Sequence, residues 1–338
     1  MKRSHSRVAH GLVVAAGLLS ILIAACVGAA RIPLTHAVLT LLHPSASPRW
    51  EALVIWRVRL PRALAAYLVG GALAASGGAL QALFRNALAE PGVLGVSNGA
   101  ALGAVLAIFG GLAARSPIAV PAAACLGSVA VTLGLVALTG ARRASNSQSL
   151  LLAGLALANL AAAGTTLTIS FALANYDVGR QVLAWLLGGL DGRTWNHVAM
   201  ASAPILGGTA VLLGHASSLD AMLMGDVTAA AVGVNPRRVR LHLVLATAAM
   251  TGISVAVGGA IGFVGLLVPH VARRMVGAHH AELLPACFFG GGAFLVVADI
   301  LARTVIAPEE LRLGVVTAVI GSPFFLFLVM RTHQAAER

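Results

Sequence analysis

Residues 59–99 read RLPRALAAYLVGGALAASGGALQALFRNALAEPGVLGVSNG, and this stretch decides the fold. Two arginines flank Pro61, and an uncharged run follows that is long enough for a helix to cross a bilayer, which takes about 20 apolar residues. A soluble helix of this length would carry a polar stripe, and none is present. Its glycines and alanines are small residues that let neighbouring helices approach closely in lipid. The stretch therefore predicts a membrane span that leads into a polar, structured loop at 85–98.

The composition extends this prediction to the whole chain. Hydrophobic residues make up 59% and charged residues 10%, with a mean hydropathy of +0.91. Soluble domains are about a quarter charged, and no segment here is polar enough to fold separately. We therefore expect residues 1–338 to form a single all-α transmembrane domain. The net charge of +12 does not indicate nucleic-acid binding, because the arginines lie at the ends of apolar runs.

The order of apolar runs and charged loops predicts about ten spans with both termini in the cytoplasm. They are placed at 11–30, 60–82, 93–112, 118–138, 150–173, 197–213, 241–259, 261–275, 283–301 and 313–330. A cleaved signal peptide would begin in the same way as the first run, but the length of that run and the spans after it favour a span. Residues 31–58, which contain Pro33, Pro44 and Pro48, are expected to form an external loop.

Two shorter segments are predicted to be surface helices. Residues 178–190 are amphipathic and too short to span, which indicates an external re-entrant helix. Residues 219–234 mix apolar and polar positions and are followed by three arginines, which favours a cytoplasmic surface helix.

The positive charges support this topology only weakly. Thirteen of the 23 lysines and arginines fall on the cytoplasmic side. The other ten fall outside, and they include Arg59, Arg62 and Arg303. Such arginines either extend their charge to the interface from the ends of spans or are kept for a partner. The sequence leaves both readings open.

Several motifs carry a resemblance. The 59–99 stretch, GGAIGFVGLLVPHVARRMVG at 258–277, ADILAR at 298–303 and LRLGVVTAVIGSPFFLFLVMR at 311–331 occur in one order. They resemble the bacterial ABC importer permeases for vitamin B12, iron-siderophores and haem, the FecCD-type family. The resemblance covers residues from about 50 to the end. It implies a type II importer permease of the bacterial inner membrane, working as a homodimer with two ATP-binding subunits and a periplasmic binding protein.

The same resemblance implies roles for individual residues. Arg59 and Arg303 match positions that receive acidic residues of the binding protein, with Arg62 as a structural neighbour. The cytoplasmic gate falls at Asn86 and Leu88 and, in the loop before the fifth span, at Ser147 and Gln148. Gln148 departs from the small hydroxyl pair of the vitamin B12 permeases. The segment MLMGDVTAAAVGV matches the coupling helix that contacts the ATPase, and its residues are Leu223, Gly225, Asp226, Ala230 and Gly233.

No catalytic activity is expected of the chain alone. Lys2 is its only lysine, so a phosphate-binding P-loop is absent and ATP hydrolysis requires another subunit. We expect no resident cofactor or metal, since the histidines show no ligand spacing. An ion-coupled secondary transporter is the alternative from another class, but such proteins usually carry ionisable residues within their spans. Among the cargoes, general resemblance favours haem or a ferric siderophore, with cobalamin as the alternative.

Overall fold

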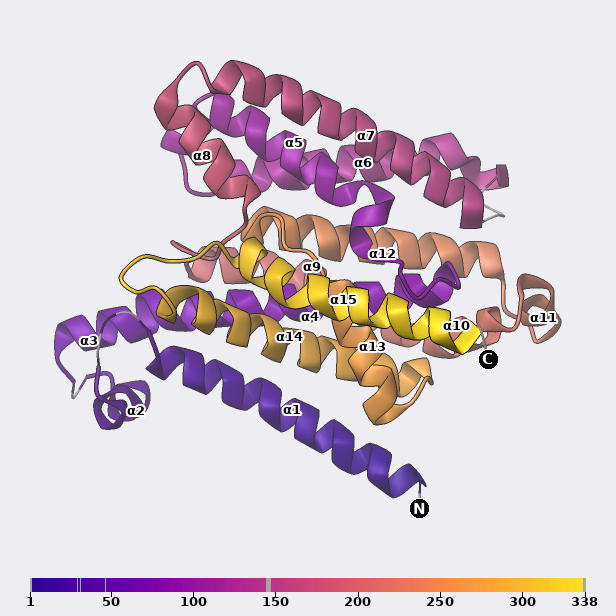
Figure 1. The fold of residues 1–338 in the computed structure, drawn as a ribbon, viewed down its shortest axis with the longest axis horizontal. Helices are drawn as coiled ribbons and strands as arrows, with labels where there is room; N and C mark the ends of the chain where they lie inside the picture. Colours follow the sequence, from indigo (N-terminus) through magenta and orange to yellow (C-terminus); the bar gives the residue numbers. More distant parts are fainter. Residues whose placement is uncertain (1, 29, 31, 46, 144–146, 337–338) are drawn as a thin grey trace.

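The computed structural model describes residues 2–336 apart from 29, 31, 46 and 144–146, and the regular structure in this part of the chain is entirely helical (Figure 1). The α-helices are α1 (Lys2–Cys26), α2 (Leu34–Leu42), α3 (Arg49–Leu53), α4 (Leu60–Leu83), α5 (Val96–Phe109), α6 (Ala119–Arg143), α7 (Ser147–Ala172), α8 (Tyr176–Leu186), α9 (Trp195–Gly214), α10 (Ala216–Leu223), α11 (Asp226–Ala231), α12 (Pro236–Gly258), α13 (Val264–Val276), α14 (His280–Thr304) and α15 (Leu313–Ala336). A π-helix, η1 (Val54–Arg59), and two 3₁₀ turns, η2 (Pro91–Leu94) and η3 (Leu112–Ala114), complete the set. The predicted all-α class is confirmed.

Ten of these helices occupy the ten predicted spans, namely α1, α4, α5, α6, α7, α9, α12, α13, α14 and α15. Within the described residues, seven helical segments are long and apolar enough to cross a membrane, and these involve α1, α4, α6, α7, α9, α12 and α14. The apolar parts of α5 and α15 are shorter, at Val96–Phe109 and Leu313–Phe327. The predicted eighth span is the shortest, because α13 begins at Val264 after a left-handed Phe263 with φ of +68°.

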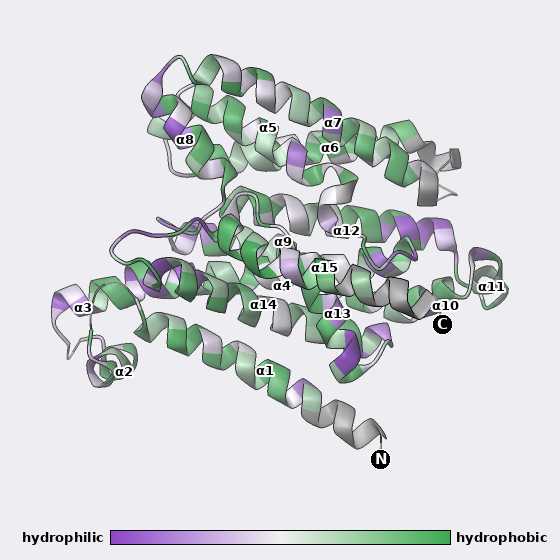
Figure 2. Ribbon diagram, viewed as in Figure 1, coloured by the Kyte–Doolittle hydropathy of each residue, from purple (hydrophilic) through white to green (hydrophobic). Residues whose placement is uncertain are grey.

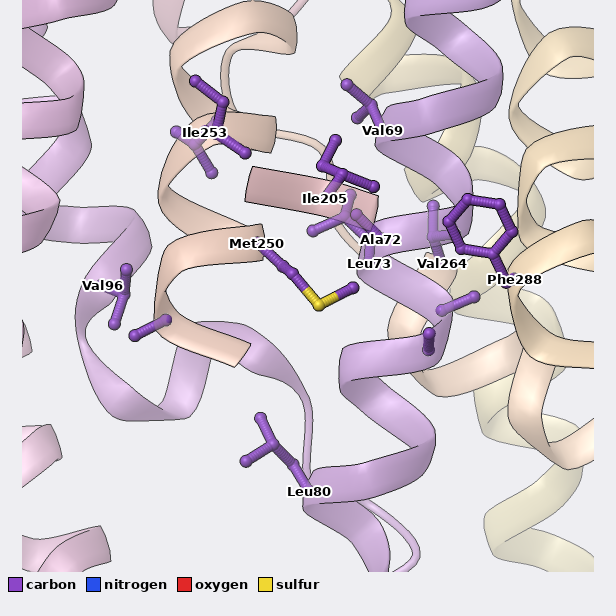
Figure 3. Close-up of a cluster of buried hydrophobic side chains, with 14 of the residues drawn as sticks. Val69, Ala72, Leu73, Leu80, Val96, Ile205, Met250, Ile253, Val264 and Phe288 are labelled. Atoms are coloured by element: carbon purple, nitrogen blue, oxygen red, sulfur yellow. The ribbon is translucent and has the colours of Figure 1, made fainter. Parts of the chain in front are cut away.

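Helix α4 runs through the centre of the bundle, and nearly all of its side chains are buried (Figure 1). Its glycines permit this. A Cβ atom on Gly77 would lie 2.0 Å from the carbonyl oxygen of Gly265 in α13, and one on Gly70 would lie 2.2 Å from that of Gly291 in α14. The helices can meet at these points only because no side chain intervenes. Figure 3 shows the apolar side chains that fill the surrounding core, contributed by α4, α5, α9, α12, α13 and α14.

The predicted external loop at residues 31–58 is wrong as a description of the backbone, which is largely helical there. Helices α2 and α3 form there, and η1 joins α3 to α4, so residues 49–83 are helical throughout. Pro33 and Pro48 suggested a loop, but each stands immediately before the first residue of a helix. A proline is tolerated there because its missing N–H would have no partner within the helix.

The predicted surface helix at 219–234 is also corrected, because it consists of two short helices, α10 and α11. They are separated at Gly225, whose φ of +116° is a conformation that residues with a side chain rarely adopt. The other predicted short helix is confirmed as α8, with slightly earlier bounds. Its N-terminus is capped by the Asn175 side chain, which accepts hydrogen bonds from the N–H groups of Asp177 and Val178.

The polar residues gather at the two ends of the molecule, and the middle is apolar (Figure 2). One end holds α10, α11 and both chain termini, whereas α2, α3 and α8 lie at the other (Figure 1). This distribution is what a bilayer requires, because charged groups must leave the hydrocarbon layer.

Candidate functional site

Arg59 and Arg303 lie at the end of the bundle that holds α2 and α3, and both close the C-terminal end of α1. Arg59 donates from Nη1 to the carbonyl oxygens of Cys26 (2.6 Å) and Ala25 (3.3 Å), and from Nη2 to that of Ala30. Arg303 donates from Nη2 to Ala24 O at 2.9 Å. The last carbonyls of a helix lack partners within it and carry partial negative charge, so two guanidinium groups suit this position.

This placement bears on the predicted docking role. Arg59 and Arg303 are each only 3% exposed, so neither guanidinium is presented to a partner in this conformation. Docking of a binding protein on these residues stays a prediction. It requires the side chains to leave the carbonyl groups that they now hold.

Arg62, predicted to be a structural neighbour of the docking residues, forms ion pairs within the chain. Its guanidinium contacts Asp299 in α14 (Nη2–Oδ1, 2.9 Å) and Glu310 in the following loop (Nη2–Oε2, 2.9 Å). Asp299 is 1% exposed and also lies 3.5 Å from Nε of Arg303. Buried charges are tolerated only when they are paired and hydrogen-bonded, and the Asp299 carboxylate meets that condition by accepting hydrogen bonds from Nε of Arg62 at both of its oxygens. This network ties α4, α14 and the α14–α15 loop together at one end of the bundle.

A charged cavity of about 250 Å³ lies beside this network. Its lining includes Arg62, Asp191, Glu310 and Arg312, and Arg312 Nη1 lies 3.6 Å from Asp191 Oδ1. The sequence did not single out Asp191 as a site residue. Its partner Arg312 is far along the chain, and an ion pair of this separation has no local sequence signature.

At the opposite end, α10 and α11 cover most of the predicted coupling segment, residues 219–234, and α10 begins three residues before it. Leu223, Ala230 and Gly233 are exposed, and Gly225 makes the turn between the two helices. The sequence missed the most exposed apolar side chains of this segment, which are Met224 (75%), Val227 (86%) and Val232 (68%). Exposed apolar side chains at a polar end are typical of a protein contact.

Asp226, the remaining predicted coupling residue, is paired on both sides. Its Oδ1 accepts from Nη2 of Arg85, in the loop after α4, and its Oδ2 accepts from Nη2 of Arg240 in α12, both at 2.9 Å. Arg85 was not predicted as a site residue. Its sequence signal is its position immediately before the predicted gate residue Asn86.

The predicted cytoplasmic gate is described in part. Asn86 accepts a hydrogen bond at Oδ1 from the Leu88 N–H (2.9 Å), so its side chain fixes a turn after α4. The Leu88 side chain is 43% exposed at this turn. The backbone of Ser147 and Gln148 begins α7, but their side chains lie outside the described part of the structure.

The same loop continues to Glu90, which the sequence did not identify. Its carboxylate accepts a hydrogen bond from the Phe263 N–H at the start of α13, and with Ser97 and Asn98 it lines a cavity of about 240 Å³. Burial raises the pKa of Glu90 above its usual value, and the Phe263 hydrogen bond offsets part of this rise. The loop 85–95 therefore contacts the coupling segment at one end and the α12–α13 connection at the other.

Most histidines in the described part of the chain contact other protein groups. His280 lies at the start of α14, and its backbone N–H donates to Asp220 of α10 at 3.2 Å, while its ring also contacts that carboxylate. Among the described residues, no group of three or more His, Cys, Asp or Glu side chains is arranged to hold a metal ion.

The chain is similar to a known family of transport proteins and to several of its members. The model of the FecCD transport family matches residues 16–331. The chain is 41% identical to the vitamin B12 import system permease protein BtuC of Klebsiella pneumoniae subsp. pneumoniae over 283 residues, 83% of each chain. It is also 41% identical to BtuC of Vibrio vulnificus over 280 residues, covering 82% of this chain and 83% of that protein.

The fold has a solved counterpart. A structure described as an inward-facing conformation of a transporter assigned to the metal-chelate ABC type superposes with a TM-score of 0.84 at 28% sequence identity. The match covers 96% of this chain and 99% of the other.

Proposed function

This chain belongs to the FecCD transport family of ABC importer permeases, and we propose that its cargo is cobalamin or a closely related corrinoid. One observation carries the choice of cargo: about 41% identity to vitamin B12 permeases over more than four fifths of both chains. This identity favours cobalamin, the alternative cargo, over haem, which the sequence motifs alone had favoured.

Membership of the family implies two kinds of partner, an ATP-binding subunit and a substrate-binding protein. We propose that two copies of the permease assemble with two copies of the ATP-binding subunit, and that the permease alone hydrolyses no ATP. The absence of any lysine after Lys2 supports the second point, because a P-loop needs one. The exposed Met224, Val227 and Val232 support contact of α10–α11 with the ATP-binding subunit.

The chain is a multi-pass protein of the inner membrane, and we propose that the end bearing α10, α11 and both termini faces the cytoplasm. The basic residues at that end support this orientation, since cytoplasmic loops carry an excess of arginine and lysine. Among them are Arg237 and Arg238 at the start of α12 and Arg273 and Arg274 at the end of α13. The end with α2, α3 and α8 would then meet the binding protein in the periplasm.

Reconstitution in proteoliposomes tests the proposal. The permease, its ATP-binding subunit and its binding protein are combined with cobalamin, haem or a ferric siderophore, with and without internal ATP. We expect ATP-dependent accumulation of cobalamin and no ATP hydrolysis by the permease alone. Accumulation of haem or the siderophore in preference to cobalamin would overturn the cargo, and uptake driven by a proton or sodium gradient without ATP would overturn the class of transporter.

A further inference from the structure

Arg85 occupies a backbone position that is unusual for its residue type. It is left-handed, with φ of +48°, and it directly follows Phe84, the C-cap residue of α4. The Arg85 N–H donates to Ala82 O (3.1 Å) and the Asn86 N–H donates to Gln81 O (3.0 Å). This pair of bonds is the Schellman motif, in which glycine is the usual residue at the left-handed position because a Cβ atom is disfavoured there. A strained residue of this kind points to a role for its side chain.

The Arg85 side chain reaches the coupling segment. Nε donates to the carbonyl oxygen of Met222 at 3.0 Å, and Nη2 donates to Oδ1 of Asp226 at 2.9 Å. The first acceptor belongs to the end of α10 and the second to the start of α11, so one guanidinium group joins both helices across the Gly225 turn. A planar guanidinium can donate in two directions at once, which a lysine ammonium does less well.

Asp226 continues the connection to a long helix. Its second oxygen accepts from Nη2 of Arg240, whose side chain is buried in α12 (3% exposed). In contrast, the side chains of Arg85 and Asp226 are 45% and 40% exposed. The Asp226–Arg240 ion pair thus fixes the coupling segment to the bundle, whereas the Asp226–Arg85 ion pair is partly exposed to water. A half-exposed ion pair is weak enough to break and re-form during a transport cycle.

Asn86 and Leu88 follow Arg85 directly, and the Asn86 side chain already orders Leu88 through a hydrogen bond. A shift of α10–α11 that moves Met222 and Asp226 must therefore move Arg85 and the turn after it, or break the contact. We propose that Arg85 and Asp226 form a coupling clasp, a pair of positioning residues that transmits movement of α10–α11 to the gate turn 86–88. This inference rests on the proposed function, because it needs an ATPase acting on α10–α11.

The variant Arg85→Gly separates the side chain from the backbone. Glycine removes the guanidinium and relieves the left-handed strain while the Schellman motif is kept. We expect thermal unfolding at the same or a higher temperature, together with a loss of about fivefold or more in cargo moved per ATP hydrolysed by the complex. Arg238→Gln is the matched control, since Arg238 is exposed on α12 and makes no ion pair in the described part of the chain. A variant that transports normally per ATP, or one that loses stability and transport together, overturns the clasp.

A double-mutant cycle tests the pair itself. Arg85→Gln and Asp226→Asn should each lower the transport-to-ATP ratio, and the double variant should be no worse than the poorer single variant, because either change breaks the same contact. Losses that multiply in the double variant would mean that the two residues act separately.

The contact can also be tested on the permease alone, without its partners. In a background with the three native cysteines replaced by alanine, Leu88→Cys is labelled with a maleimide in detergent. Breaking the clasp should speed labelling by about threefold or more in both single variants, the double variant should label no faster than the faster single variant, and Arg238→Gln should leave the rate unchanged. Unchanged labelling in Arg85→Gln overturns the clasp. Failure of the wild-type complex to move any cargo would instead count against the proposed function, and the labelling result would still decide whether Arg85 holds the gate turn.

Discussion

Replacement of Arg59 by methionine should loosen the end of α1 from the bundle. The methionine keeps an apolar stem of similar length but cannot donate to the carbonyl oxygens of Ala25, Cys26 and Ala30. These acceptors would lose their donor in a place where Arg59 is only 3% exposed and water has little access.

The magnitude follows from those three bonds. Hydrogen bonds that involve a charged group contribute about 1.5–3 kcal/mol each, and a cation at a helix C-terminus adds about 0.3–1 kcal/mol. Part of this is offset because the variant no longer buries a charge, which is costly in itself. We therefore expect a net loss of about 2–4 kcal/mol, which for a chain of this length corresponds to a fall of about 3–6 °C in the apparent unfolding temperature.

The assay compares Arg59→Met with Arg57→Met, a change at an exposed arginine of the same π-helix. Thermal unfolding in detergent is measured first, and association with the binding protein is then measured by surface plasmon resonance at low and high salt. A helix clamp predicts that only Arg59→Met unfolds earlier. If both variants unfold alike, and only Arg59→Met associates more slowly with an effect that shrinks as salt rises, the clamp is refuted and the docking prediction is favoured.

Three further changes test other contacts. Asp299→Ala should cost about 3–5 kcal/mol, because it leaves buried arginines without their carboxylate, and thermal unfolding measures the loss. Gly77→Ala should destabilise the chain because its Cβ would lie 2.0 Å from Gly265 O, whereas Gly207→Ala, whose Cβ meets nothing within 4 Å, should unfold like the wild type. Glu90 binds its proton more tightly in the folded state, so its contribution to stability should fall as the pH rises above its usual pKa of 4.5, and Glu90→Gln should flatten this part of the pH profile of unfolding.

The spans could be predicted because their signal is local. Each run is long, apolar and bounded by charged or turn residues, and those features alone determine a membrane helix. The segment at 31–58 was mistaken for a loop because proline both breaks helices and begins them. Pro33 and Pro48 do the second, and a sequence without its structure does not distinguish the two.

The contacts of the site residues could not be predicted for a different reason. The acceptors of Arg59 are backbone carbonyls some thirty residues away, and every residue carries such a carbonyl, so they leave no mark in the sequence. Asp226 could be placed in the coupling segment from its motif. Its partner Arg85 lies 141 positions earlier, where only the packing of α4 against α10 brings it near.

The arginines at the two ends of α4 are held in different ways, and the difference suits a transporter. At one end Arg59 and Arg62 are buried, and their contacts with α1 and with Asp299 would be costly to break. At the other end Arg85 is half-exposed, and its contact with Asp226 is of the kind that contributes only about 0–1 kcal/mol. An element that is fixed at one end and weakly held at the other can move a short loop repeatedly without unfolding its own helix. Breaking the Arg85–Asp226 contact therefore takes little free energy, as the repeated opening and closing of a gate requires. A buried ion pair in its place would hold the gate in one position.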